Sequence, residues 1–380
     1  MTTTNRRNFL RLSAFAGGAL GVGALDLAGQ PMATPVVPSS DSPLKILVLG
    51  GTGFIGPHEI RYALARGHEV TMFNRGRSNP ELFPNVERLI GDRDAQLEAL
   101  EGRQWDAVID NSGFYPRHAR LSAELLEPNV GQYLFVSSIS AYDGETLQPR
   151  QHPDEAPYAT MADPTDESEG PYGPSYGPRK ALAEQEVLKV FGSERTTLVR
   201  PGLITGPGDP TDRIRHWFAR AEMGGEILVP GPVDGPVQYI DARDLSGWMI
   251  RLLEDGTPGN FNGVGPRDDM TTAELVYGLA AAVSSSRTFT WVDWDFLVEN
   301  EFMAGYTPVV PPGAESFMTI YNQNSVDSGL TYRSWAETTQ DMYAEYVTLA
   351  NGGYTEGFGW RAGLSPEDSA RALAAWHERM

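Results

Sequence analysis

An α/β fold with a doubly wound parallel sheet and a smaller C-terminal α/β lobe is predicted from three observations. The apolar run Leu44–Leu49 is rich in branched residues, which is typical of a buried parallel strand. The run ends in glycines with the spacing G-x-x-G-x-x-G, at Gly50, Gly53 and Gly56, and a helical pattern follows. A second strand, Glu69–Phe73, comes at the interval of a β-α-β unit, so the stretch predicts a Rossmann-type, dinucleotide-binding architecture.

The glycine-rich turn predicts where the dinucleotide would bind. Glycine lets the turn bend tightly and lets the backbone approach a pyrophosphate, whose charge then faces the amides of the helix N-terminus. The residues that we assign to this contact are Gly50, Thr52, Gly53, Phe54, Ile55 and Gly56. The alternative is a glycine-rich turn in an α/β protein that binds no nucleotide.

Length, charge and composition limit the function classes. The chain has 380 residues, 41% of them hydrophobic, which is enough for one large α/β domain or two lobes. The formal net charge of -20 disfavours nucleic acid and anionic membranes as partners. Because the chain has no cysteine, disulfides, thiolate metal sites and cysteine nucleophiles are excluded. The histidines show no metal-ligand spacing, so we expect no metal site and a small-molecule substrate as the partner.

The N-terminal residues 1–43 predict an export signal and a linker. Arg6 and Arg7 precede a Phe-Leu pair and a mildly apolar stretch, an order typical of a twin-arginine signal. The apolar part is diluted by glycine and interrupted by Asp26, so no stable membrane span is expected. We expect recognition by the twin-arginine export machinery and an exported, periplasmic or extracellular protein. The alternative is a basic N-terminus on a cytoplasmic protein.

The end of the second predicted strand bears on the choice of cofactor. NAD-binding folds usually place a carboxylate there, which binds the adenosine ribose hydroxyls. This chain instead has Asn74, followed by Arg75 and Arg77. A neutral amide tolerates a 2′-phosphate, and an arginine can bind one through two hydrogen bonds, so the pattern favours NADP over NAD. The alternative is NAD bound through Asn74, with both arginines in solvent.

The next two predicted strands, Val86–Ile90 and Trp105–Asp110, end in further candidates for cofactor binding. These candidates are Asp92, Arg93, Ser112 and Gly113. Asp92 could accept a hydrogen bond from an adenine edge, or it could cap the helix that follows. The small residues after the second of these strands let a cofactor pass close to the backbone. Tyr115 falls near the same site, where it could contact substrate or serve as ordinary lining.

A later strand and helix provide candidates for proton transfer. The strand from Tyr133 ends at Ser138, and Tyr176 and Lys180 stand four residues apart at the start of a helix, so they share one helix face. A lysine cation beside a phenol would lower the pKa of Tyr176, which would suit that residue to exchange a proton with a carbonyl–alcohol pair. Ser138 could hold the same oxygen, and Lys180 could also reach the nicotinamide ribose.

These features together resemble the extended branch of the short-chain dehydrogenases/reductases, the NAD-dependent epimerase/dehydratase family. The resemblance covers the chain from Leu44 onward. The motifs that carry it are Gly50–Gly56, Val136–Tyr142, Tyr176 with Lys180, Arg200–Gly208 and Val237–Asp244. It implies an NAD(P) cofactor and, because such enzymes commonly pair through two long helices, a homodimer.

The resemblance also implies roles for individual residues. Ser138, Tyr176 and Lys180 would be catalytic, with Ser138 preferred over its neighbour because it lies four residues before Tyr142. The backbone of three residues would contact the nicotinamide end: Pro201, Gly202 and Leu203. The candidates for substrate contact are Tyr115, Ser140 and Arg213, the last because a basic residue hereabouts helps to hold a nucleotide-sugar phosphate in extended members.

Besides Asn74 at the second strand, two features depart from the family pattern. Pro178 lies inside the Tyr-Lys motif, so the helix must begin late, with Ser175 as N-cap and Tyr176 as the first helical residue. The acidic, proline-containing segment 143–173 is an insertion that we expect to pass over the mouth of the site. A solvated loop, or a specific role towards a cation or substrate, are the open alternatives for this segment.

The chain therefore divides, by expectation, into a signal and linker (1–43), an NAD(P)-binding Rossmann domain (44–205) and a mainly substrate-binding lobe (206–380). Some segments of the lobe return to the Rossmann domain, and Asn260–Gly265 is predicted as a strand of the lobe. Thr271 and Glu274 predict a helix with a capping box.

The expected function is an NAD(P)-dependent oxidoreductase or epimerase that acts on a secondary alcohol or carbonyl of a sugar-like small molecule. Tyr176 would move the proton. An export signal argues against a nucleotide sugar as substrate. The alternative is a non-catalytic NAD(P)-binding or regulatory protein, although such proteins often lack the tyrosine or lysine that this chain retains.

Overall fold

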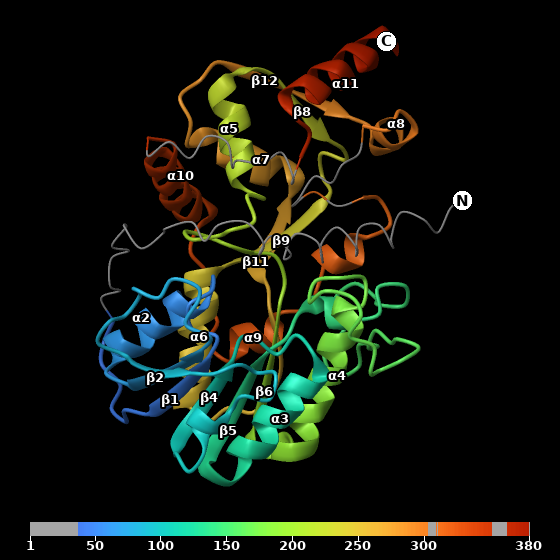
Figure 1. Cartoon of the computed structure of the whole chain (residues 1–380). Coiled ribbons are helices and arrows are strands. Elements are labelled where there is room, and N and C mark those ends of the chain that lie inside the picture. The colour runs from blue at the N-terminus through green and yellow to red at the C-terminus, as the bar shows by residue number, and fades with distance from the viewer. Residues whose placement is uncertain (1–36, 303–308, 310, 352–362, 380) are drawn as a thin grey trace.

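The computed structural model describes residues 37–302, 309, 311–351 and 363–379. The predicted twin-arginine signal lies outside the described residues. Figure 1 shows a helix-covered sheet in its lower part and a lobe with α5, α7, β8, β12 and α11 in its upper part. Within the described ranges, no helix combines the length and the apolar character that crossing a membrane requires.

Seven parallel strands of the described residues form the main sheet, in the order β10-β6-β5-β4-β1-β2-β3. The strands are β1 (Lys45–Leu49), β2 (Glu69–Asn74), β3 (Glu87–Ile90), β4 (Trp105–Asp110), β5 (Val130–Val136), β6 (Thr196–Pro201) and β10 (Gly259–Gly263). The chain runs outward from β1 to β3 and then crosses back to β4, which confirms the predicted doubly wound sheet. Open α/β sheets bind ligands at such a switch point, outside the carboxyl ends of the strands.

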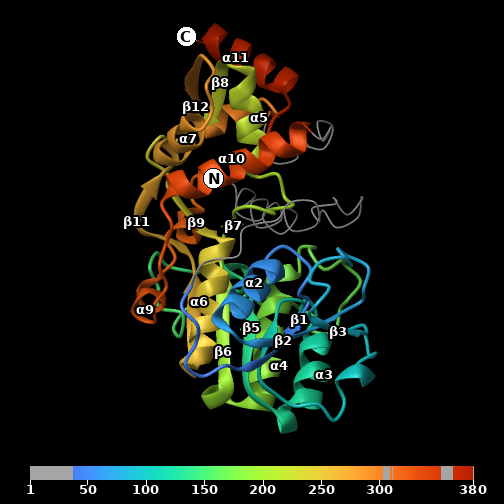
Figure 2. The ribbon, with the colours of Figure 1, turned by 90° about the vertical axis from the view of Figure 1, so that its left-hand side faces the viewer.

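Helices cover both faces of this sheet, as Figures 1 and 2 show. On one face lie α2 (Gly56–Arg66) and α6 (Ala242–Glu254), and on the other lie α3 (Pro116–Leu126) and α4 (Tyr176–Phe191). Residues of β1 alternate between the two cores: Ile46 and Val48 pack with α2 and α6, whereas Leu47 and Leu49 pack with α3 and α4. Burial on both faces explains the continuous apolar run that predicted this strand.

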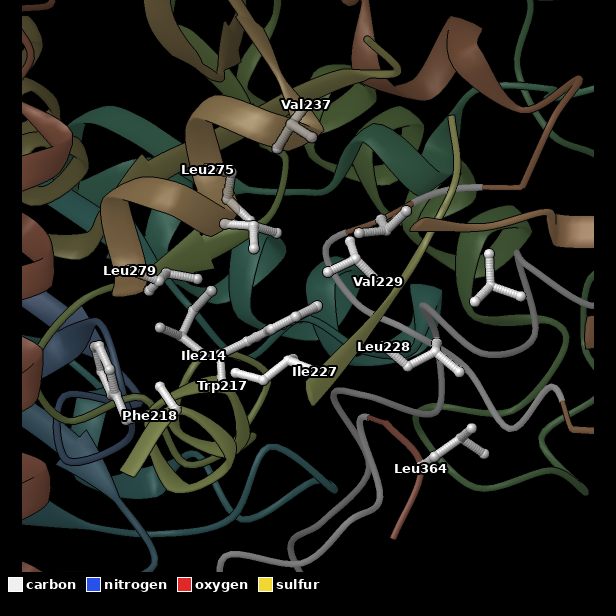
Figure 3. Packing of buried hydrophobic residues seen from close by; sticks show 14 of the residues in the cluster. Ile214, Trp217, Phe218, Ile227, Leu228, Val229, Val237, Leu275, Leu279 and Leu364 are labelled. Atoms are coloured by element: carbon white, nitrogen blue, oxygen red, sulfur yellow. The ribbon is translucent and has the colours of Figure 1, made fainter. Parts of the chain in front are cut away.

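The lobe has a hydrophobic core of its own, shown in Figure 3, in which Trp217, Phe218 and Leu275 are buried. Its helices and strands are α5 (Arg215–Met223), β8 (Gly225–Pro230), α7 (Thr272–Ala281), β12 (Arg287–Val292), α8 (Trp294–Glu299), α10 (Trp335–Asn351) and α11 (Pro366–Arg379). A small sheet of β7 (Ile204–Thr205), β9 (Pro236–Asp241) and β11 (Gly265–Thr271) lies between the lobe and the main sheet.

Short helices complete the described elements. They are η2 (Glu98–Leu100), η3 (Glu127–Asn129), η4 (Ile139–Ala141), η5 (Ser193–Arg195), η6 (Glu315–Met318) and α9 (Gln323–Asp327). The predicted capping box is confirmed, because Thr271 Oγ1 accepts the Glu274 amide and the Glu274 carboxylate accepts the Thr271 amide.

The prediction that Asn260–Gly265 forms a strand of the lobe is wrong. β10 instead pairs in parallel with β6 at the edge of the main sheet, with Phe261 opposite Val199. The cause is α6, whose apolar side packs beside α2 on the main sheet and buries Trp248. Because α6 packs on the main sheet, a right-handed crossover brings the strand that follows it, β10, into the main sheet.

Candidate active site

The glycine-rich loop after β1 forms a tight backbone turn against α2. Gly50 has a φ of 94°, and a Cβ on it would lie 3.1 Å from the Ser112 side chain. A Cβ on Gly56 would lie 2.6 Å from the backbone of Gly51, so α2 begins directly against the loop. Gly53 differs, because it is exposed and the nearest atom to an added Cβ is 3.9 Å away. The loop therefore leaves open space at Gly53, beside the N-terminus of α2, where an anion would fit.

Ser138 and Tyr176 meet at the carboxyl end of β5. Helix α4 begins at Tyr176 with Ser175 as N-cap, as the position of Pro178 predicts. A Cβ on Gly177 would lie 2.1 Å from the Ser140 carbonyl oxygen, so only glycine lets α4 begin this close to η4. The approach brings the Tyr176 phenol close to the Ser138 side chain, which lowers the pKa of Tyr176 and accepts the Ser140 amide at 3.1 Å.

Lys180 lies one turn further along α4 and is buried. Its Nζ donates to the Val136 carbonyl oxygen at 2.7 Å and to the Gly113 carbonyl oxygen at 3.1 Å. It also lies 4.2 Å from the centre of the Phe135 ring. Burial lowers the pKa of Lys180 to about 8, although Asp110 and Glu184 oppose the shift. The lysine thus links the ends of β4 and β5.

The expectation that Lys180 lowers the pKa of Tyr176 is wrong for the described structure. Burial raises the pKa of Tyr176, and the groups that oppose this rise are Ser138 and Arg213. The physical reason is that the Lys180 ammonium group is engaged elsewhere, because it donates to the Val136 and Gly113 carbonyl oxygens. The cation that acts on the phenol comes from the lobe instead.

Arg213 is held at the lobe side of the site by two hydrogen bonds. Its Nε donates to Thr211 Oγ1 at 2.7 Å and its Nη2 donates to the Ile204 carbonyl oxygen at 2.9 Å. Thr211 is itself held by the buried Asp209 at 2.6 Å. Burial lowers the pKa of Arg213, which Asp209 and Tyr176 oppose. Among the described residues Nη1 has no hydrogen-bond partner, so this nitrogen remains free to bind a ligand.

Three aromatic rings line the tyrosine side of the site. The ring centroids of Phe114 and Tyr172 lie 5.0 Å apart, and those of Tyr172 and Tyr176 lie 5.9 Å apart. Tyr172 belongs to the inserted segment, and sequence analysis did not select it, since a lone tyrosine in a polar loop carries no signal. Tyr115, in contrast, donates to the Glu169 carbonyl oxygen at 3.2 Å and packs under Arg179.

The inserted segment 143–173 is bound to the main domain near its C-terminal end and at its middle. Arg179 of α4 donates to the carbonyl oxygens of Asp166, Glu169 and Gly170. In the middle of the segment, the Tyr158 hydroxyl accepts a hydrogen bond from buried Arg200 at 2.6 Å, and Arg200 also forms a fully buried ion pair with Glu184. The segment is therefore a structured border of the site rather than a loose loop.

Comparison with known proteins decides the family. The family model described as NAD dependent epimerase/dehydratase matches residues 46–263, more than half of the chain. This chain belongs to that family. It is 30% identical over 273 residues to the 2-alkyl-3-oxoalkanoate reductase of Stenotrophomonas maltophilia, a match that covers 64% of this chain and 77% of that protein.

Two further matches extend the comparison. The chloroplast stem-loop binding protein of 41 kDa b from Arabidopsis thaliana is 29% identical over 233 residues, which are 57% of this chain and 56% of that protein. The structure of UDP-glucuronic acid 4-epimerase from Bacillus cereus in complex with NAD has a TM-score of 0.60 at 15% identity, over 81% of this chain and 98% of that chain, which shows a shared fold. The chain is thus an NAD(P)-dependent enzyme of the extended short-chain dehydrogenase/reductase type.

The family implies a dinucleotide, and the residues at the end of β2 fit its adenosine half. Asn74 Oδ1 accepts the Gly76 amide at 2.9 Å, while its Nδ2 is buried and has no partner within the described ranges. Arg75 and Arg77 are exposed and form no ion pair with other described residues. An orphaned amide donor and two unpaired cations in an acidic enzyme suit an anionic ligand.

The next two predicted cofactor residues differ in environment. Asp92 Oδ1 accepts the Asp94 amide at 3.1 Å in a local turn. Arg93 is buried and pairs with Asp110, holding the pKa of that carboxyl below its usual range although burial opposes the shift. It also reaches Ser112 Oγ at 3.2 Å, so it supports the end of β4. Contact of Asp92, Arg93, Ser112 or Gly113 with cofactor stays a prediction.

The remaining predicted residues lie at the carboxyl end of β6. The Gly202 amide donates to the Gly263 carbonyl oxygen at 3.2 Å, and the Leu203 carbonyl oxygen accepts the Ile240 amide at 2.9 Å. These bonds hold the segment Pro201–Leu203 between β10 and β9, and its contact with nicotinamide stays a prediction. Within the part of the chain that the structure describes, no group of three His, Asp or Glu side chains could hold a metal ion.

Proposed function

We propose that this enzyme reduces a carbonyl group of a small, sugar-like molecule with NADP(H) as the preferred cofactor. The observation that carries the proposal is that Ser138, at the carboxyl end of β5, and Arg213 of the lobe both act on the Tyr176 phenol. Nicotinamide, when bound, supplies or accepts the hydride. An epimerase or dehydratase would use the same groups for a reversible transfer, so the substrate decides among these outcomes.

Tyr176 is the proposed proton donor. Because burial raises the pKa of Tyr176, the phenol is protonated at neutral pH and suits donation to a carbonyl oxygen. Ser138 then donates a hydrogen bond to the phenolate or to the substrate oxygen. Arg213 contributes a positive charge on the lobe side, which stabilises the negative charge that develops on either oxygen.

The cofactor preference rests on the end of β2. The orphaned Asn74 amide and the unpaired Arg75 and Arg77 are donors without an acceptor, and a 2′-phosphate would supply one. Denaturing release of nucleotide from the purified protein, followed by mass analysis, tests this preference. Recovery of NADP(H) is expected, and recovery of NAD(H) alone would refute it.

The test of the activity compares two tyrosines of the aromatic row. Tyr176→Phe should lower the rate of NADPH oxidation with a responsive keto sugar or 3-oxo acid by about 10²- to 10⁴-fold, since the proton donor is lost. Tyr172→Phe keeps the ring beside Tyr176 and should retain most of the rate. Both variants should bind NADPH as the unaltered enzyme does. Equal rates for Tyr176→Phe and the unaltered enzyme would refute the mechanism.

A further inference from the structure

A buried carboxyl group lies behind the glycine-rich loop. Glu59 is the fourth residue of α2, and its exposed fraction is 0%. Its neighbour His58 bonds to the Pro207 carbonyl oxygen at 3.0 Å, and burial lowers the pKa of that histidine to about 4, so it is neutral. Arg61, one turn on, donates to the Pro57 carbonyl oxygen. No charged side chain among the described residues compensates Glu59.

Among the described residues the Glu59 carboxyl has one hydrogen-bond partner, which lies at the switch point of the sheet. Asn111, directly after β4, donates from Nδ2 to Glu59 Oε2 at 2.5 Å. The Asn111 Cβ lies 3.6 Å from where a Cβ on Gly50 would be. The pair therefore sits beneath the first glycine of the loop, between the N-terminal turn of α2 and the end of β4.

Two acceptors of this pair are left without a donor. Glu59 Oε1 and Asn111 Oδ1 are both buried, and neither has a partner in the part of the chain that the structure describes. A carboxylate oxygen and an amide oxygen are both acceptors, so they cannot form a hydrogen bond with each other. When the carboxyl group is protonated, its O–H becomes a donor. Burial raises the pKa of Glu59 to about 7, with the Asn111 bond opposing the shift. The free protein thus titrates here near neutral pH.

We propose that Glu59 is a positioning residue of the dinucleotide cradle, and that its carboxyl is protonated when the dinucleotide binds. The proton comes from solvent, adds to one carboxyl oxygen of Glu59, and breaks no bond in the ligand. The reason is electrostatic repulsion. The pyrophosphate would lie at the same helix N-terminus as the buried Glu59 carboxylate, which has no compensating charge. Protonation of Glu59 removes the repulsion between these two negative groups. The inference rests on dinucleotide binding at this loop, not on the proposed substrate or reaction.

The pH dependence of cofactor affinity tests the inference. Fluorescence titration with NADPH from about pH 6 to about pH 8.5 should show affinity falling by up to about tenfold per pH unit above neutrality, relative to Glu59→Gln. The 2′-phosphate titrates equally in both proteins, so the comparison cancels its contribution. The control is Glu69→Gln, which removes an exposed carboxylate at the amino end of β2, away from the glycine-rich loop. Its affinity should depend on pH as that of the unaltered enzyme does. Parallel profiles for Glu59→Gln and the unaltered enzyme would overturn the inference.

A second measurement covers the case in which Glu59→Gln does not fold. Calorimetry of the unaltered enzyme with NADH, in buffers of different ionisation enthalpy near pH 7.5 (roughly half a unit above the Glu59 pKa), counts protons taken up on binding. Net uptake is expected, and zero uptake would overturn the inference while leaving the proposed function standing. If neither NADPH nor NADH binds, both the inference and the proposed function fail.

Discussion

The sheet side and the lobe side of the candidate site differ in how far the fold itself satisfies the buried cations near Tyr176. On the sheet side, Lys180 donates to two strand carbonyls and Arg93 pairs with Asp110. On the lobe side, Arg213 is held by two bonds and keeps one nitrogen without a partner in the described residues. The cations on the sheet side are therefore engaged by the protein before any substrate binds, whereas Arg213 on the lobe side keeps a donor that a substrate could use. Specificity should lie in the lobe and the inserted segment.

The largest effect is expected from breaking the link between the inserted segment and the sheet. Arg200→Met leaves Glu184 charged and fully buried, so the free energy of unfolding should fall by about 3–5 kcal/mol. The control is Arg150→Gln, which breaks an exposed pair between the same segment and Asp269 and should cost less than about 1 kcal/mol. Chemical denaturation measures both. Equal losses would show that breaking the buried Arg200–Glu184 pair costs no more than breaking the exposed Arg150–Asp269 pair.

A smaller effect concerns the buried carboxyl of the sheet side. The pKa of Glu59 rises from 4.5 to about 7 on folding, so the folded state is penalised as pH rises through that interval, by about 3 kcal/mol once pH exceeds the folded value. Glu59→Gln carries no such penalty. Its advantage in unfolding free energy over the unaltered enzyme should grow from about pH 5 to about pH 8. If the difference in unfolding free energy between Glu59→Gln and the unaltered enzyme stayed constant across that range, the raised pKa of Glu59 would be contradicted.

The smallest effect concerns the lobe side and is catalytic. Arg213→Gln removes the cation that opposes the raised pKa of Tyr176, so the alkaline limb of the pH–rate profile should move up by about one unit and kcat should fall about tenfold. Arg213→Lys should recover part of both effects, because it restores the charge. NADPH affinity should not change. An unchanged alkaline limb in Arg213→Gln would show that Arg213 does not influence the pKa of Tyr176.

Several site features follow from local chemistry and were predictable. The G-x-x-G-x-x-G spacing places the loop, and Pro178 requires α4 to begin at Tyr176. Ser138 and Tyr176 were paired by the family resemblance, and the structure places Ser138 close enough to lower the pKa of Tyr176. The direction of Lys180 was not predictable, because its partners on β5 and after β4 are 44 and 67 residues away in the sequence.

By itself the sequence determined the parallel sheet, the glycine-rich loop, the position of the tyrosine helix and the family, because each depends on residue types at short spacing. Tertiary structure alone decided which sheet β10 joins, which cation acts on Tyr176 and how Glu59 is buried. Glu59 falls in the helical pattern that follows the loop, and only its complete burial in the folded chain raises the pKa of its carboxyl, against the opposing bond from Asn111. The physical reason is that burial and pairing depend on distant segments, whose contacts leave no local periodicity in the chain.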